Sequence, residues 1–69
     1  LALARLMKRD AIPLIMPFLD DPTPRVMGDA IDALGRLRAE PAVFKIRALT
    51  QHPDSYIREK ARRALKKLV

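Results

Sequence analysis

The side chains able to act as a nucleophile, an acid or a base are few and scattered in this chain. His52 is the single histidine and precedes Pro53, there is no cysteine, and Ser55 has no strand-turn-helix context of the kind that exposes a nucleophile. A general base must be oriented by partner groups and must reach a nucleophile or a substrate proton. The sequence around His52 supplies no such set. We therefore interpret His52 as a turn residue.

Carboxylates and glycines give no stronger signal for catalysis. Asp20 and Asp21 form an adjacent pair that a helix-to-helix turn explains, since no further oxygen ligands recur at the spacing of a metal site. One histidine and no cysteine exclude multi-histidine and thiolate metal sites. Gly28 and Gly35 lie within a predicted helix rather than in a phosphate-binding loop. The sequence predicts no catalytic residue, no metal and no cofactor, and hence a protein that is not an enzyme.

The distribution of charge is more informative. Fourteen Lys and Arg against eight Asp and Glu give a net charge of +6. Six of these cations share the last predicted helix, namely Arg58, Lys60, Arg62, Arg63, Lys66 and Lys67. Such a helix suits the solubilising end of a repeat array, the binding of an acidic protein, or contact with nucleic-acid phosphates. Nucleic acid is the least favoured of these, because the chain has only three aromatic residues for base stacking.

The preceding long helix lacks charged residues at several positions outside its apolar stripe. Met27, Gly28, Ile31 and Gly35 fall outside its apolar stripe, where the last helix has charged residues. Glycine within a helix costs up to about 1 kcal/mol relative to alanine, so the pair indicates the close approach of a protein partner, a second copy or the neighbouring repeat. The candidate partner surface joins both helices and comprises Met27, Gly28, Ile31, Gly35, Arg58, Arg62, Arg63, Lys66 and Lys67.

An internal repeat organises the elements that carry these side chains. A shift of 31 residues superposes residues 21–26 on 52–57 and aligns apolar positions along the whole chain without a gap. Apolar residues at offsets 0, 4, 7, 8 and 11 from Val26, and again from Ile57, form one stripe of an amphipathic helix. Each unit therefore contains one long helix.

Five helices are predicted, in the order long, short, long, short, long, with the first one truncated. The short helices cover residues 11–19 and 41–50. Thr23 and Asp54 are the predicted N-caps of the two complete long helices. Pro17 should kink or loosen the helix in which it lies. The fold class is all-α, an α-solenoid (a right-handed α–α superhelix) of about two repeats.

The repeat divides the chain into just over two units. Sixty-nine residues form one small domain. We expect a single domain, 1–69, with the end of a partial repeat at 1–9, a repeat at 10–40 and a carboxyl-terminal repeat at 41–69. Repeat units bury their apolar faces against neighbours, and about three are normally needed for stability. We therefore expect the carboxyl-terminal part of a longer solenoid, or self-association at the amino-terminal edge.

The motif at the turns carries a family resemblance. It runs Asp21-Pro22-Thr23-Pro24-Arg25-Val26, then Ala30, Ala33-Leu34-Gly35 and Glu40-Pro41-Ala42-Val43. This pattern resembles HEAT repeats, in particular the short HEAT-like repeats of phycobiliprotein-lyase relatives, over essentially the whole chain. The resemblance implies a ladder between repeats, in which Asp21 pairs with Arg58. Met27 and His52 depart from the pattern, which has arginine and aspartate at those positions.

Equivalent positions of stacked repeats lie side by side. Asp29 and Asp32 occupy the same repeat positions as Lys60 and Arg63. We therefore predict at least one acidic–basic pair between the two complete long helices.

The expected function is that of a non-enzymatic scaffold that binds a protein partner, for which an acidic one fits the charge. The alternative is binding of the nucleic-acid backbone through the basic last helix. An accessory role in chromophore attachment, implied by the resemblance, finds no reactive group here. No apolar run approaches the ~20 residues of a membrane span, so no membrane is expected among the partners, and the cytoplasm is the expected location.

Overall fold

The computed structural model describes residues 10–68, which form helices and turns and contain no strand. In chain order the elements are α2 (Ile12–Ile15), the 3₁₀ helix η1 (Met16–Asp20), α3 (Pro24–Arg36), the 3₁₀ helix η2 (Glu40–Ala42), α4 (Val43–Leu49) and α5 (Ser55–Leu68). The all-α prediction is confirmed. The truncated first helix, and the amino-terminal edge expected to self-associate, fall in 1–9 and lie outside the described residues.

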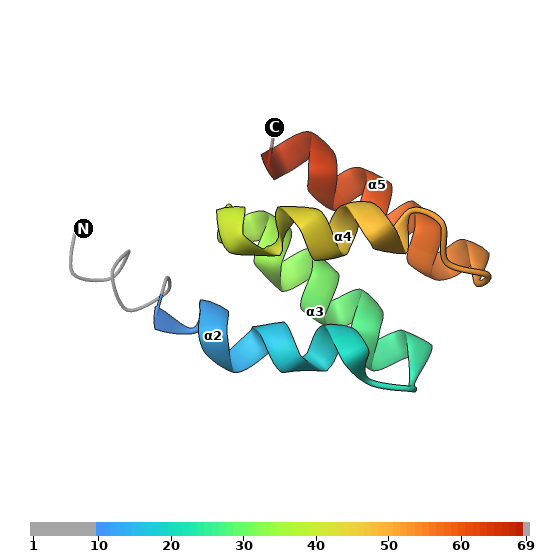
Figure 1. Cartoon of the computed structure of the whole chain (residues 1–69), viewed down its shortest axis with the longest axis horizontal. Helices are drawn as coiled ribbons and strands as arrows, with labels where there is room; N and C mark the ends of the chain where they lie inside the picture. The colour runs from blue at the N-terminus through green and yellow to red at the C-terminus, as the bar shows by residue number, and fades with distance from the viewer. Residues whose placement is uncertain (1–9, 69) are drawn as a thin grey trace.

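The long helices α3 and α5 run parallel and in contact, and the short elements cover one side of this pair (Figure 1). The contact between α3 and α5 is the most extensive one in the described part, while η1 packs on α3 and α4 packs on α5. Each unit is thus a short and a long element, repeated beside itself as in an α-solenoid. None of the described helices has the length and apolar character that crossing a membrane requires.

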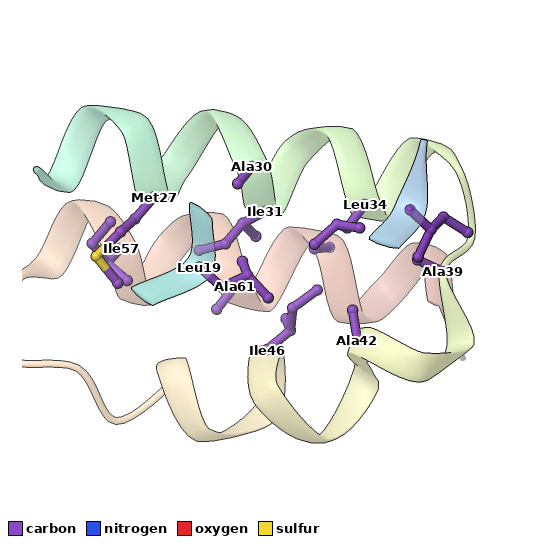
Figure 2. Packing of buried hydrophobic residues seen from close by; sticks show 12 residues of the cluster. Leu19, Met27, Ala30, Ile31, Leu34, Ala39, Ala42, Ile46, Ile57 and Ala61 are labelled. Atoms are coloured by element: carbon purple, nitrogen blue, oxygen red, sulfur yellow. The ribbon is translucent and has the colours of Figure 1, made fainter. Parts of the chain in front are cut away.

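One apolar core lies between the pair of long helices and the short elements that cover it (Figure 2). Its largest fully buried side chains come from both units, and they are Leu19, Ile31, Leu34, Ile46 and Ile57. Burial of one such side chain contributes about 1.5–3 kcal/mol. Because the cluster is shared, each unit depends on the other to exclude water from its apolar face.

The first short helix is broken, as Pro17 predicts. The four residues of α2 pass directly into η1, and Pro17 lies in the first turn of η1. Proline has no N–H to donate, and its ring clashes with the preceding turn of an α-helix. In the second unit the proline comes at the start, Pro41 in η2, and seven residues of regular α4 follow.

The two long helices begin differently. The Oδ1 atom of Asp54 accepts the N–H of Tyr56 at 2.9 Å and caps α5, as predicted. Thr23 stands at the N-cap of α3, but its side chain makes no capping hydrogen bond. Its carbonyl oxygen still accepts the first helical bond, from the N–H of Met27 at 3.0 Å. Only the backbone of Thr23 therefore serves as the cap, followed by Pro24 with its preset φ.

The carboxyl end of α3 is a Schellman motif without glycine. The N–H of Ala39 bonds to the carbonyl of Leu34 at 3.0 Å, and the N–H of Arg38 bonds to that of Gly35 at 3.1 Å. Arg38 has a φ of 52°, a left-handed conformation that costs a residue with a Cβ about 1–2 kcal/mol. The motif buries Ala39 completely and turns the chain toward η2.

Candidate functional site

His52 and Asp21 perform the same task in equivalent turns. The Oδ1 atom of Asp21 accepts the N–H of Thr23 at 2.8 Å, and the Nδ1 atom of His52 accepts the N–H of Asp54 at 3.0 Å. In both cases the side chain reaches the N–H two residues later, as in an Asx-turn. An imidazole nitrogen accepts such a bond only when it carries no proton. The prediction that His52 is a turn residue is confirmed.

Arg58 is held within its own turn. Its Nη1 atom donates to the carbonyl oxygens of His52 and Pro53, both at 2.8 Å. No ion pair joins it to Asp21 among the residues the structure describes. The predicted ladder contact between Asp21 and Arg58 is therefore wrong. The reason is local: each side chain bonds to backbone groups a few residues away in its own turn.

Two other ion pairs link the first unit to the second. The Oδ2 atom of Asp20, at the end of η1, lies 2.6 Å from the Nζ atom of Lys45 in α4. The Oδ2 atom of Asp32 in α3 lies 2.6 Å from the Nζ atom of Lys60 in α5. The second pair confirms the predicted acidic–basic contact between the long helices.

The uncharged members of the candidate partner surface are buried inside the chain. Met27 is 7% exposed, Ile31 is fully buried, and Gly28 and Gly35 are buried beside them. The prediction of a partner surface at these four positions is wrong, because α5 packs on this face and the approaching surface is the neighbouring repeat. A middle long helix needs one apolar face for its short helix and another for the next long helix. The spacing indicates only the first.

The two glycines allow α3 and α5 to approach closely. A Cβ atom on Gly35 would lie 3.1 Å from the Cβ atom of Ala64 and 3.2 Å from its Cα atom. A Cβ atom on Gly28 would lie 2.6 Å from the Cε2 atom of Tyr56. Neither glycine has a positive φ, so these positions require space rather than conformational freedom.

The Lys60 side chain interacts with residues of both long helices, α3 and α5. Its Nζ atom bonds to Asp32 and lies 5.5 Å from the centre of the Tyr56 ring, a cation–π distance. The hydrogen bond from Lys60 to the Asp32 carboxylate raises the pKa of Lys60 above its usual 10.5, against the lowering effect of desolvation. Both charged side chains are partly shielded, with 23% of Lys60 and 32% of Asp32 exposed.

An open depression of about 480 Å³ lies on the seam between the two long helices. We name it the α3–α5 groove, and the residues that line it are Asp32, Arg36, Lys60, Arg63, Lys66 and Lys67. Five lining residues are cationic, and the single carboxylate is the one bound by Lys60. Among the described residues, the other four cations form no ion pair.

The groove overlaps the predicted basic surface in part. Three predicted cations of α5, including Lys67, line it. Arg62 is exposed but does not line the groove, and Arg58 is held in the turn. Arg36, on the α3 side of the groove, was not among the predicted residues. The signal was present, because the 31-residue shift places Arg36 on Lys67 and equivalent positions of successive repeats are neighbours.

The chemistry that this arrangement offers is the binding of anions. Guanidinium groups donate pairs of parallel hydrogen bonds to oxyanions, and ammonium groups add point charges. Cations gathered in one concave surface also raise the local concentration of anionic partners. In residues 10–68 no group of three or more His, Cys, Asp and Glu side chains is arranged to hold a metal ion.

Comparison with known protein families identifies a repeat family. Residues 1–66 match the family model of HEAT repeats. Comparisons with the curated proteins and with the solved structures find no match. The matched region spans both units and agrees with the turn motif, the 31-residue period and the paired helices.

Proposed function

The chain belongs to the HEAT repeat family, and from this premise we propose that it is a helical-repeat scaffold without catalytic activity, whose basic α5 face binds an acidic protein partner. HEAT repeats present surfaces of stacked helices, and such arrays contact other macromolecules along extended faces. The proposal gives the chain the same role at the face of its last described helix.

The observation that carries the proposal is the concentration of unpaired positive charge on and beside α5. Arg63, Lys66 and Lys67 lie together with Arg36, and the described residues provide no ion-pair partner for any of them. Clustered like charges repel one another, and an acidic partner relieves this repulsion while it gains charge complementarity. The proposal therefore specifies the charge of the partner.

Binding of an oligoglutamate peptide of about ten residues tests this function. We expect the chain to bind it, with affinity that falls between about 50 mM and about 150 mM NaCl because salt screens exposed charges. The double variant Lys66→Glu/Lys67→Glu should bind at least roughly tenfold more weakly, a change of about 1.4 kcal/mol. Isothermal titration calorimetry measures both.

The matched control is Arg25→Glu/Arg47→Glu, which changes the net charge equally at exposed positions of α3 and α4. It should retain binding within about threefold, a difference of under 1 kcal/mol. Equal losses in the two double variants would mean that net charge alone attracts the peptide, and would contradict the proposal. Tighter binding of duplex DNA than of the peptide, with a steep salt dependence, would instead favour the nucleic-acid alternative.

A further inference from the structure

We infer that the α3–α5 groove is the subsite that holds carboxylates of the acidic partner, with Arg36 and Arg63 as their paired guanidinium contacts. This inference rests on the proposed function and adds to it a location, a second helix and a pair of residues. It adds a cation of α3, Arg36, which the predicted partner surface did not include.

The first support is that two helices build the groove. Arg36 comes from the last turn of α3 and Arg63 from α5, and both line the same depression. The close contact of Gly35 with Ala64 holds the helix backbones together at this end of the seam. Side chains that flank such a contact, one from each helix, can therefore reach the same ligand in the groove. Two planar guanidinium groups suit carboxylates, which they bind in a bidentate manner.

The second support is the charge balance within the groove. Lys60 neutralises Asp32, and this pair is fixed by a 2.6 Å contact. The remaining four lining residues are cations that form no ion pair among the described residues. A bound group with several negative charges would therefore balance the positive charge of the groove. The Asp32–Lys60 pair leaves one end of it electrically neutral, so the excess positive charge comes from the other four lining residues, Arg36, Arg63, Lys66 and Lys67.

The size and lining of the groove favour a peptide over a polynucleotide. About 480 Å³ of open space accommodates a few side chains, within the usual range of binding pockets. None of the six lining residues is aromatic, so no ring is available to stack on bases. The neutral Asp32–Lys60 pair also lies in the lining, so a phosphodiester chain that followed the seam would meet excess positive charge along only part of the groove. Glutamate or aspartate side chains can enter singly beside this pair.

The decisive variant is Arg36→Gln, because Arg36 lies outside the basic helix. Its matched control is Arg25→Gln, an equal change of charge at an exposed position of the same helix. We expect Arg36→Gln to weaken binding of the oligoglutamate peptide by roughly five- to tenfold, and Arg25→Gln by less than about twofold. Arg63→Gln provides the same test from α5, and Arg36→Lys should restore only part of the affinity because it lacks the bidentate geometry.

The outcomes separate this inference from the proposed function. If Arg36→Gln and Arg63→Gln behave like Arg25→Gln while Lys66→Glu/Lys67→Glu abolishes binding, the proposed function stands, but Arg36 and Arg63 are not the carboxylate contacts and this inference is overturned. If the native chain does not bind the peptide, the proposed function itself fails. If Arg36→Gln weakens binding of a DNA duplex of about 12 base pairs more than it weakens binding of the peptide, the groove holds a phosphate backbone and this inference is wrong. Circular dichroism melts of each variant verify that the helices remain folded.

Discussion

The two ends of the seam between α3 and α5 use glycine in the same way but meet different neighbours. At the amino end, Gly28 lies against the ring of Tyr56, which is 39% exposed. At the carboxyl end, Gly35 lies against the Cα and Cβ atoms of Ala64. A side chain at its tip can rotate out of the way, whereas a helix backbone can move only with its helix. One end of the seam is therefore adaptable and the other is rigid.

This difference coincides with a difference in charge. The adaptable end is aromatic, while the rigid end lies beneath the cations of the α3–α5 groove. A binding constellation works best when its side chains stand on elements that do not shift. The seam thus brings the close contact of Gly35 with Ala64 together with the cations of the groove.

The largest effect on the free energy of unfolding is expected from a substitution at the rigid end of the seam. Gly35→Ala gains up to about 1 kcal/mol of helix propensity, but overpacking against the α5 backbone costs about 1–3 kcal/mol. We expect a net loss of about 1–2 kcal/mol in the free energy of unfolding, measured by urea denaturation. A variant as stable as the native chain would show that α5 moves freely and that the contact is not rigid.

A smaller effect, of opposite sign, is expected just beyond the rigid end. Arg38 has the left-handed φ for which glycine is suited, so Arg38→Gly relieves strain at the cost of greater freedom in the unfolded chain. The net result should be a gain of about 0.5–1 kcal/mol in the free energy of unfolding. Arg36→Gly, two residues earlier in the right-handed helix, is the control and should lose about 1 kcal/mol. Equal signs for the two would contradict this account.

At the adaptable end, Gly28→Ala should be nearly neutral. The displaced Tyr56 ring loses contacts, while the helix gains propensity, and we expect the sum to lie within about 0.5 kcal/mol of zero. In a Tyr56→Ala background the same substitution should stabilise by up to about 1 kcal/mol, since nothing then opposes it. A double-mutant cycle measures this coupling. Additive effects would mean that the ring does not restrict Gly28.

The last prediction concerns the dependence of stability on pH and the ion pair midway along the seam. The pKa of Lys60 is raised in the folded chain, so its contribution to stability is complete below the usual 10.5 and is lost as pH rises through the raised value. Between about pH 8 and about pH 11 the native chain should lose more stability than Lys60→Gln, by no more than about 1 kcal/mol. Urea melts at both values provide the comparison. An identical alkaline loss in the two chains would exclude a contribution from the pair.

Much of the fold follows from features that repeat along the chain. The 31-residue period predicts which residues become long helices, and Pro17 predicts the break in the first short element. An acidic–basic pair between the long helices follows from the period, although Asp32 bonds to Lys60 and not to Arg63, which occupies the equivalent position. These successes share a cause: each depends on local sequence or on the period alone.

The errors arise where the rotation between successive units matters. A helical stripe locates one apolar face of α3, but not the angle at which α5 packs on it. Ile31 and Met27 were therefore assigned to a free surface that is in fact buried. Arg36 was missed for a different reason: the period already places it beside Lys67, but the cations were compared along the last helix and not across the seam. The Asp21–Arg58 contact failed because backbone carbonyls lie nearer to Arg58 than a carboxylate in another turn does.

The 3₁₀ geometry of η1 has a consequence for how the first unit opens. Its i→i+3 hydrogen bonds are poorer than those of an α-helix, and Pro17 contributes no amide proton. The segment nevertheless holds Leu19, which is 1% exposed within the shared core. Amide protons of η1 should thus exchange with solvent through local fluctuations, while those of α3 await global unfolding. Each such fluctuation withdraws Leu19 and briefly hydrates the core between the two units.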